Sequence, residues 1–137
     1  MPALNSYDYA IVRVVPCVER GEYINAGVIL FCRTRRFLDA LIYLDIQRLT
    51  TLYPAVDLDM VQRHLDIIPL VCAGSAEAGA IGQLSQSERF HWLVSPRSTV
   101  IQMSPVHTGR TTDLAAALDR LMDTMVRPRR GEKPAPA

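Results

Sequence analysis

Residues 21–33, GEYINAGVILFCR, hold the segment that decides how this chain is organised. The second half is rich in β-branched and apolar residues and predicts a strand over residues 23–33. The even positions from Ile24 to Cys32 are all apolar, which predicts one continuous face buried against a core. The first half contains a glutamate, an asparagine and two glycines, which weaken strands. The segment therefore predicts a strand whose first residues depart from regular strand structure.

Two interpretations of the interruption are open from the sequence. In the first, Gly21 is the turn residue of a hairpin, and Asn25 and Gly27 mark a β-bulge or a close approach of two backbones. In the second, Glu22 and Asn25 present polar groups beside the bare backbone at Gly27 and form a small binding niche. Arg13, on the preceding strand, would then pair with Glu22, because a buried arginine needs a partner.

The flanking segments extend this strand into a sheet. Residues 7–15 and 37–44 have the composition of strands, and the short connections favour an antiparallel meander with residues 23–33. Residues 98–103 alternate and predict a fourth strand beside the first hairpin. We therefore predict a single α+β domain over residues 6–126, an antiparallel sheet of about four strands with helices packed on one face.

Helical periodicity marks much of the remaining chain. Helices are expected at residues 45–53, 57–68, 85–94 and 111–126. Asp57 is the expected N-cap of the second helix and Pro69 its end. Ser85 and Glu88 have the spacing of a capping box, which favours the third helix, although a strand beginning at Phe90 is the alternative.

The other segments predict loops and a tail. Residues 73–82 are small and contain three glycines, which predicts a flexible loop. Residues 104–110 predict a second loop, after which Thr111 or Thr112 caps the last helix. Residues 127–137 are basic, rich in proline and nearly free of large apolar side chains, so we expect a disordered tail.

The composition of the 137 residues excludes several classes of protein. Hydrophobic residues make up 49% and charged residues 21%, which is ordinary for a soluble domain. The formal net charge of +1 gives no electrostatic reason to expect nucleic-acid binding. The apolar run at residues 26–32 is too short to span a membrane, and the N-terminal residues lack the pattern of a signal peptide. We therefore expect a cytoplasmic protein without membrane contact.

Neither the cysteines nor the histidines have the spacing of a known metal or redox motif. The three cysteines are Cys17, Cys32 and Cys72, and we expect reduced thiols that are mostly packed in the core. The histidines are also far apart in the sequence, at His64, His91 and His107. Because the common nucleotide and hydrolase motifs are also absent from the sequence, no cofactor or metal ion is expected.

The segment SPRSTVIQMSPVHTGR, residues 95–110, is the second unusual stretch. In a structural interpretation, Ser98 satisfies loop backbone groups, His107 is exposed and Thr108 helps to cap the last helix. In a functional interpretation, Arg97 and His107 form an anion site with the N-terminus of that helix. The guanidinium group of Arg97 suits a carboxylate or phosphate, and His107 could transfer a proton. The sequence alone does not determine whether these two side chains lie close together.

Together, YDYAIVRVVP (residues 7–16), RGEYINAGVILF (residues 20–31) and SPRSTVIQMSPVHTG (residues 95–109) resemble a bacterial family known only as a domain of unknown function. The resemblance extends over residues 6–126 and implies no catalytic residue. It implies a candidate partner, because members are often encoded beside HipA-like kinase-fold proteins. The positions that match its two motifs are Arg13, Gly21, Glu22, Asn25, Gly27, Val28, Arg97, Ser98, Pro105, His107, Thr108 and Gly109.

Two functional hypotheses follow. The first is an accessory or interaction protein that acts with a HipA-like kinase-fold partner. The alternative is a small enzyme or binding domain for an anionic or phosphorylated small molecule that uses Arg13, Glu22, Asn25, Arg97 and His107. The full set of candidate site residues is Arg13, Glu22, Asn25, Gly27, Arg97, Ser98, His107 and Thr108.

Overall fold

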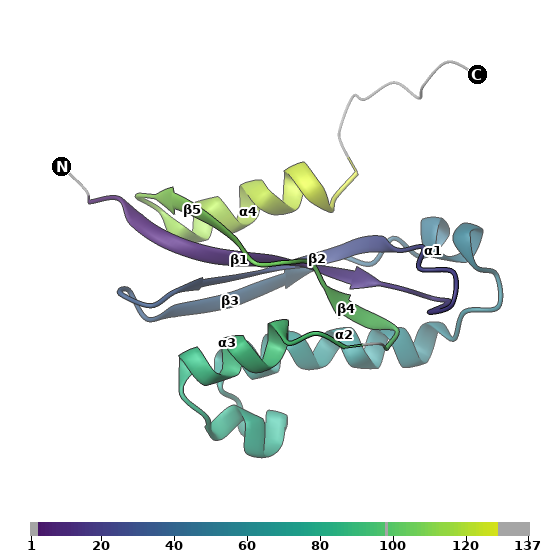
Figure 1. Ribbon diagram of the computed structural model, residues 1–137, viewed down its shortest axis with the longest axis horizontal. Coiled ribbons are helices and arrows are strands. Elements are labelled where there is room, and N and C mark those ends of the chain that lie inside the picture. The colour runs from purple at the N-terminus through teal and green to yellow at the C-terminus, as the bar shows by residue number, and fades with distance from the viewer. Residues whose placement is uncertain (1–2, 98, 129–137) are drawn as a thin grey trace.

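The computed structural model describes residues 3–97 and 99–128, in which helices cover both faces of one antiparallel sheet (Figure 1). The strands are β1 (Asn5–Val14), β2 (Ile24–Cys32), β3 (Phe37–Ile42), β4 (Ile101–Met103) and β5 (His107–Thr111). They run in the order β3-β2-β1-β4, and β5 also pairs with β1. The predicted α+β class and the antiparallel meander are confirmed. The structure adds a fifth strand and a helix on the second face.

One edge of β1 carries both β4 and β5. β4 pairs with the end of β1, whereas β5 pairs with its beginning. Ser104 joins the two strands, because its amide donates to Ile11 O and its hydroxyl accepts from the Ile11 amide. The loop predicted at residues 104–110 is therefore wrong over β5. The side chains of β5 give little strand signal, and the segment is held by the unpaired backbone edge of β1.

The interruption in β2 is a β-bulge. Val12 pairs with Gly27, but the next residue of β1, Arg13, pairs with Asn25. Ala26 is therefore one residue more than β1 can match, and the alternation of side chains inverts there. The predicted even-numbered face is consequently split: Ile24 and Ala26 share a core with Ile29 and Phe31, and Val28, Leu30 and Cys32 belong to the opposite core.

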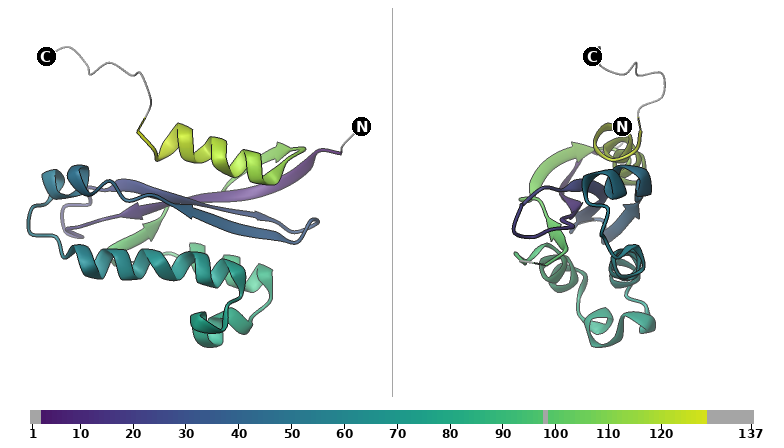
Figure 2. Two further views of the ribbon diagram at one scale, coloured as in Figure 1. Left: turned by 180° about the vertical axis from the view of Figure 1, so that it is seen from behind. Right: turned by 90° about the vertical axis from the view of Figure 1, so that its right-hand side faces the viewer.

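The helices are α1 (Ile46–Leu52), α2 (Leu58–Ala73), the 3₁₀ helix η1 (Ala76–Gln83), α3 (Gln86–Val94) and α4 (Leu114–Met125). Helices α2 and α3 cover one face of the sheet and α4 covers the other, as the edge-on view in Figure 2 shows. The expectation of helices on a single face therefore does not hold for α4. Its apolar stripe, which includes Leu118 and Met122, packs on the side chains that the bulge turns away from α2.

Local signals placed most helix starts correctly. Asp57 caps α2, and Ser85 and Glu88 form both bonds of the capping box at α3, so the alternative strand beginning at Phe90 is wrong. The predicted cap of α4 is also wrong, because Asp113 accepts from the Ala116 amide instead.

The predicted end of α2 is wrong as well. The helix continues through Pro69 to Ala73, since Ile68, Val71 and Cys72 are buried on both sides of the proline. It ends at Gly74, whose φ of 67° is left-handed. The following residues form η1 in place of the predicted loop.

Close packing at Gly27 gives a first prediction. A Cβ atom there would lie 2.6 Å from Leu41 O and 2.7 Å from Ile42 Cδ1. We expect Gly27→Ala to lower the free energy of unfolding by about 1–3 kcal/mol, because the sheet must shift to admit it. Urea denaturation measures the change. Gly21→Asn is the comparison variant. A Cβ atom at Gly21 would have no neighbour within 4 Å, and asparagine adopts a φ of 68° more readily than most residues, so we expect a smaller loss of stability than for Gly27→Ala. Equal stability of Gly27→Ala and wild type would contradict this account.

Burial of the thiols gives a second prediction. Cys32 and Cys72 are buried, as expected for thiols packed in the core, whereas Cys17 is half-buried. Burial raises the pKa of Cys72 to about 12; Asp39 adds to the shift and Arg89 opposes it. Since the thiolate is the nucleophile, we expect iodoacetamide at about pH 8 to modify Cys17 alone in the folded protein and all three thiols in urea. Mass spectrometry reads the sites, and rapid native labelling of Cys72 would refute the prediction.

Candidate functional site

A buried arginine fixes α3 against the end of α2. Arg89 Nη1 donates to the carbonyl oxygens of Val71 and Cys72 at 2.8 and 2.7 Å, and its Nε donates to Leu84 O at 3.0 Å. Two of these carbonyls belong to the last turn of α2, where the helix supplies few donors, although the Gly74 amide also donates to Val71 O. The next residue, Phe90, stacks on the Phe31 ring of β2 at a centroid distance of 5.0 Å. Helix α3 is therefore anchored to both α2 and the sheet.

Between α3 and the nearby ends of β1 and β2 is a cleft of about 680 Å³, here named the α3 cleft. Its lining includes Ser6, Asp8, Phe31, Arg33, Thr34, Ser87 and His91. Asp8 and Phe31 are register partners, so their side chains lie on the same face of the sheet. Arg33 follows two residues after Phe31 and reaches the same cleft. The antiparallel pairing of β1 and β2 thus brings together an acid and a base that are 25 positions apart in sequence.

His91 presents a defined nitrogen in this cleft. Its Nδ1 lies 2.7 Å from the carbonyl oxygen of Ser87, one turn earlier in α3. A carbonyl oxygen only accepts, so Nδ1 carries the proton and Nε2 of the neutral ring is left as an acceptor. The Ser87 hydroxyl, 3.5 Å from the same Nδ1, completes the local arrangement. The helix therefore holds the imidazole in one tautomer.

The two charged groups of the α3 cleft have no side-chain partner in the part of the chain that the structure describes. Within residues 3–97 and 99–128, neither Asp8 nor Arg33 makes an ion pair or a side-chain hydrogen bond. They line the same cleft but lie beyond ion-pair distance of each other. Both charges are consequently available to a ligand.

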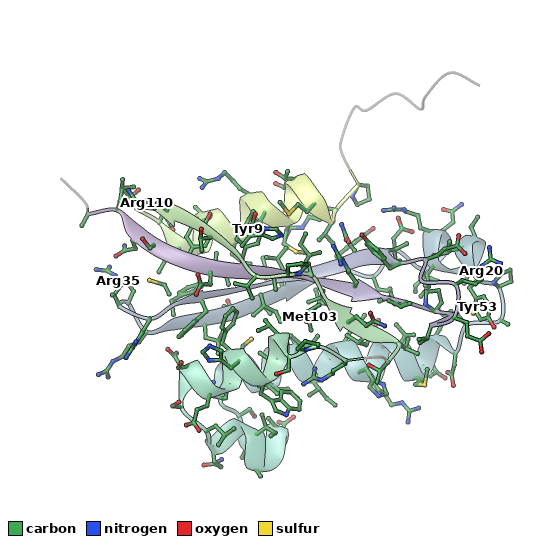
Figure 3. All side chains as sticks on the ribbon, in the orientation of Figure 1. Tyr9, Arg20, Arg35, Tyr53, Met103 and Arg110 are labelled. Carbon is green, nitrogen blue, oxygen red and sulfur yellow. The ribbon has the colours of Figure 1, made fainter. Side chains whose placement is uncertain are left out.

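A second, apolar cavity of about 240 Å³ lies between α2, the end of α3 and β4, and is here named the β4 cavity. Its lining includes Ile67, Ile68, Trp92, Leu93, Ile101 and Met103, together with His64 and Arg97. Met103 marks its position at the front of the molecule, above α2 (Figure 3). The guanidinium carbon of Arg97 lies 4.4 Å from the centre of the Trp92 ring, and Nη2 donates to Trp92 O at 2.6 Å.

The first group of candidate residues lies mainly at the bulge. Arg13 stacks on the exposed ring of Tyr23 at 4.3 Å and pairs in register with Asn25, whose Nδ2 donates to Met125 O at the end of α4. Arg13 Nε and Asn25 Oδ1 are buried without a hydrogen-bond partner among the described residues. The expected pair of Arg13 with Glu22 is wrong, because Glu22 binds Arg20. Arg20 lies at the opposite end of the molecule from Arg35 and Arg110 (Figure 3).

The second group is divided between the two faces of the sheet. Arg97 lines the β4 cavity on the α2 side. His107 pairs with Tyr9 in β1, and their rings lie 5.4 Å apart. Tyr9 packs on the α4 side. Thr108 is the register partner of Asp8 and is exposed beside the α3 cleft, whereas Ser98 lies outside the described residues. Arg97 and His107 therefore do not form one anion site, and the eight candidates do not share one surface.

Sequence reasoning missed the residues that line the α3 cleft. Asp8 and Arg33 are not among the positions matched to the two motifs, and their proximity depends on strand register. The capping box that places α3 was the available signal for His91, since it also puts Ser87 and His91 one turn apart. Arg127, assigned to the tail, is bound to Asp119 and Asp123 of α4. Residues 129–137 lie outside the described residues.

The described residues contain no group of three or more histidine, cysteine or acidic side chains arranged to hold a metal ion. No single helix among them has the length and apolar character needed to cross a membrane, although the bent pair of α2 and η1 meets those criteria jointly.

Comparison with known families identifies the chain. A model described as "Protein of unknown function (DUF3037)" matches residues 9–126, nearly the whole folded region. The chain therefore belongs to this family, which confirms the resemblance to a family of unknown function. Neither the curated proteins nor the solved structures yield a match.

The anchoring of α3 gives a third prediction. We expect Arg89→Leu to lower the free energy of unfolding by about 2–4 kcal/mol, because it removes three hydrogen bonds to backbone carbonyls, two of them buried. It should also perturb the α3 cleft and the β4 cavity together, as backbone amide shifts in NMR spectra would show. Arg63→Leu is the control, since Arg63 is an exposed arginine whose side chain makes one hydrogen bond among the described residues, to a carbonyl of its own helix. A change of less than about 0.5 kcal/mol for Arg89→Leu, the usual range for surface substitutions, would contradict the anchoring role.

Proposed function

We propose that this protein is an interaction protein, and that the β4 cavity receives an apolar side chain of a protein partner. The observation that carries the proposal is the exposed apolar surface at this cavity. Ile67 and Trp92 are 46% and 37% exposed beside it, although both are large apolar residues. Contiguous exposed apolar surface around a hollow is typical of protein interaction sites.

The size of the cavity favours a protein partner over a small molecule. Its volume of about 240 Å³ is below the range of about 300–1,000 Å³ that is usual for ligand pockets. It is better suited to one anchoring side chain, and the apolar surface beside it would contact the rest of the partner. Tryptophan and arginine, which meet here as Trp92 and Arg97, are enriched among the residues that dominate binding energy.

Arg97 indicates the charge of the partner. Its guanidinium group binds backbone carbonyls and the Trp92 ring, and no carboxylate of the described residues lies within ion-pair distance. A partner that places a carboxylate beside its apolar anchor would neutralise this cation. We propose a HipA-like kinase-fold protein as that partner, because family members are often encoded beside such proteins, and we place the complex in the cytoplasm.

Co-expression with a HipA-like kinase-fold protein tests the proposal. We expect the two proteins to elute together in size-exclusion chromatography, and Trp92→Ala to weaken binding by roughly 30-fold or more, as for a central anchor. Isothermal titration calorimetry measures the affinity.

The matched pair Ile67→Ser and Ile46→Ser supplies the control. Both isoleucines are exposed on helices, but only Ile67 borders the β4 cavity. Ile67→Ser should weaken the complex and Ile46→Ser should not. Separate elution at about 10 μM, well above the affinity of a stable complex, or equal effects of the two substitutions, would overturn the proposal.

A further inference from the structure

We propose that the α3 cleft is a second binding site, distinct from the β4 cavity, and that it binds a small zwitterion of the amino-acid or short-peptide class. The inference goes beyond the proposed protein interaction and does not depend on it. It rests on the size of the cleft, on two charged groups that line it without a partner among the described residues, Asp8 and Arg33, and on the Nε2 atom of His91.

The dimensions of the cleft suit a small molecule. Its volume of about 680 Å³ is within the range of about 300–1,000 Å³ found for ligand sites, whereas that of the β4 cavity is not. Its walls come from β1, α3, the end of β2 and the turn that follows β2, and the Phe31 ring of β2 stacks on the Phe90 ring of α3. The strands and the helix hold Asp8 and His91 in fixed positions.

The charges of the cleft select the class of ligand. Arg33 offers a planar cation that binds a carboxylate through two parallel hydrogen bonds. Asp8 faces the same space with an uncompensated negative charge and attracts an ammonium group. A ligand that carries both a carboxylate and an ammonium group therefore satisfies both side chains. The charge of Asp8 also disfavours a phosphate dianion, which was the ligand class expected for the two polar motifs.

His91 adds a second acceptor. With the proton held on Nδ1 by Ser87 O, Nε2 of the neutral ring accepts a hydrogen bond from a ligand in the cleft. An ammonium group has three donors, which Asp8 and His91 can share. The hydroxyl groups of Ser6 and Thr34 line the same cleft and supply adaptable contacts to the rest of the ligand. The hydrogen-bond acceptors that line the cleft thus outnumber its one cation, Arg33, as recognition of an ammonium group requires.

Binding of the free amino acids and of simple dipeptides tests the inference on the full-length protein. Each of the twenty amino acids, with Gly-Gly and Ala-Ala, is titrated by isothermal calorimetry up to about 10 mM, which detects dissociation constants near 1 mM. At least one is expected to bind. Its N-acetyl and C-terminal amide derivatives, which lack the ammonium and the carboxylate respectively, should each bind at least about tenfold more weakly, because each loses one charged hydrogen bond.

Three variants assign the binding to the α3 cleft. Arg33→Ala and Asp8→Asn should each weaken binding by at least about tenfold. Arg35→Ala is the matched control, because Arg35 lies in the same turn as Arg33 but does not line the cleft, and it should bind as wild type does. Circular dichroism confirms that each variant is folded.

Three results would overturn the inference. The first is the absence of binding across the panel. The second is binding that survives both Arg33→Ala and Asp8→Asn. The third is displacement of the bound amino acid by inorganic phosphate at a similar concentration, which would show a simple anion site. None of these results bears on the complex formed through the β4 cavity, so the two proposals fail separately.

Discussion

The β-bulge at Ala26 is the constraint on which the arrangement of the whole molecule depends. With a regular β2, one face of the strand would be apolar throughout and the other would be mixed. The extra residue inverts the alternation after Gly27, so that Val28 and Leu30 turn to α4 while Ile29 and Phe31 turn to α2 and α3. Residues 28–32 are apolar at every position, so β2 buries side chains on both faces and the sheet needs a helical layer on each side.

Features that depend on local chemistry could be predicted from the sequence. The capping box at Ser85 and the cap at Asp57 require only residues within one helical turn, and both are present as predicted. The bulge could be named as an interpretation, since glycine and asparagine inside an apolar strand are unusual. The division of the β2 side chains between the two faces of the sheet could not be predicted, because counting alternate positions along the sequence assumes that no residue is inserted. The end of α2 was predicted wrongly for a related reason. The burial of the residues on both sides of Pro69 outweighs the tendency of proline to end a helix.

Strand β5 and the α3 cleft could not be predicted from the sequence. β5 is defined by its partner, as the backbone edge of β1 accepts a segment whose own side chains are mostly exposed. The cleft likewise depends on strand pairing, which sets Asp8 opposite Phe31 and so places it near Arg33. The two motifs of unusual composition marked places where the backbone is irregular. The two charged groups of the α3 cleft, Asp8 and Arg33, are not among the positions matched to those motifs.

Helix α3 forms a wall of both proposed sites, so its mobility decides whether they influence each other. Coupling between two sites requires an element with two discrete positions that each ligand stabilises differently. Three hydrogen bonds from Arg89 and the stack of Phe90 on Phe31 hold α3 in one position, and a shift of the helix would break the buried bonds that Arg89 makes to carbonyls at the end of α2. The packing therefore favours two sites that are occupied independently, with α3 as a rigid support between them.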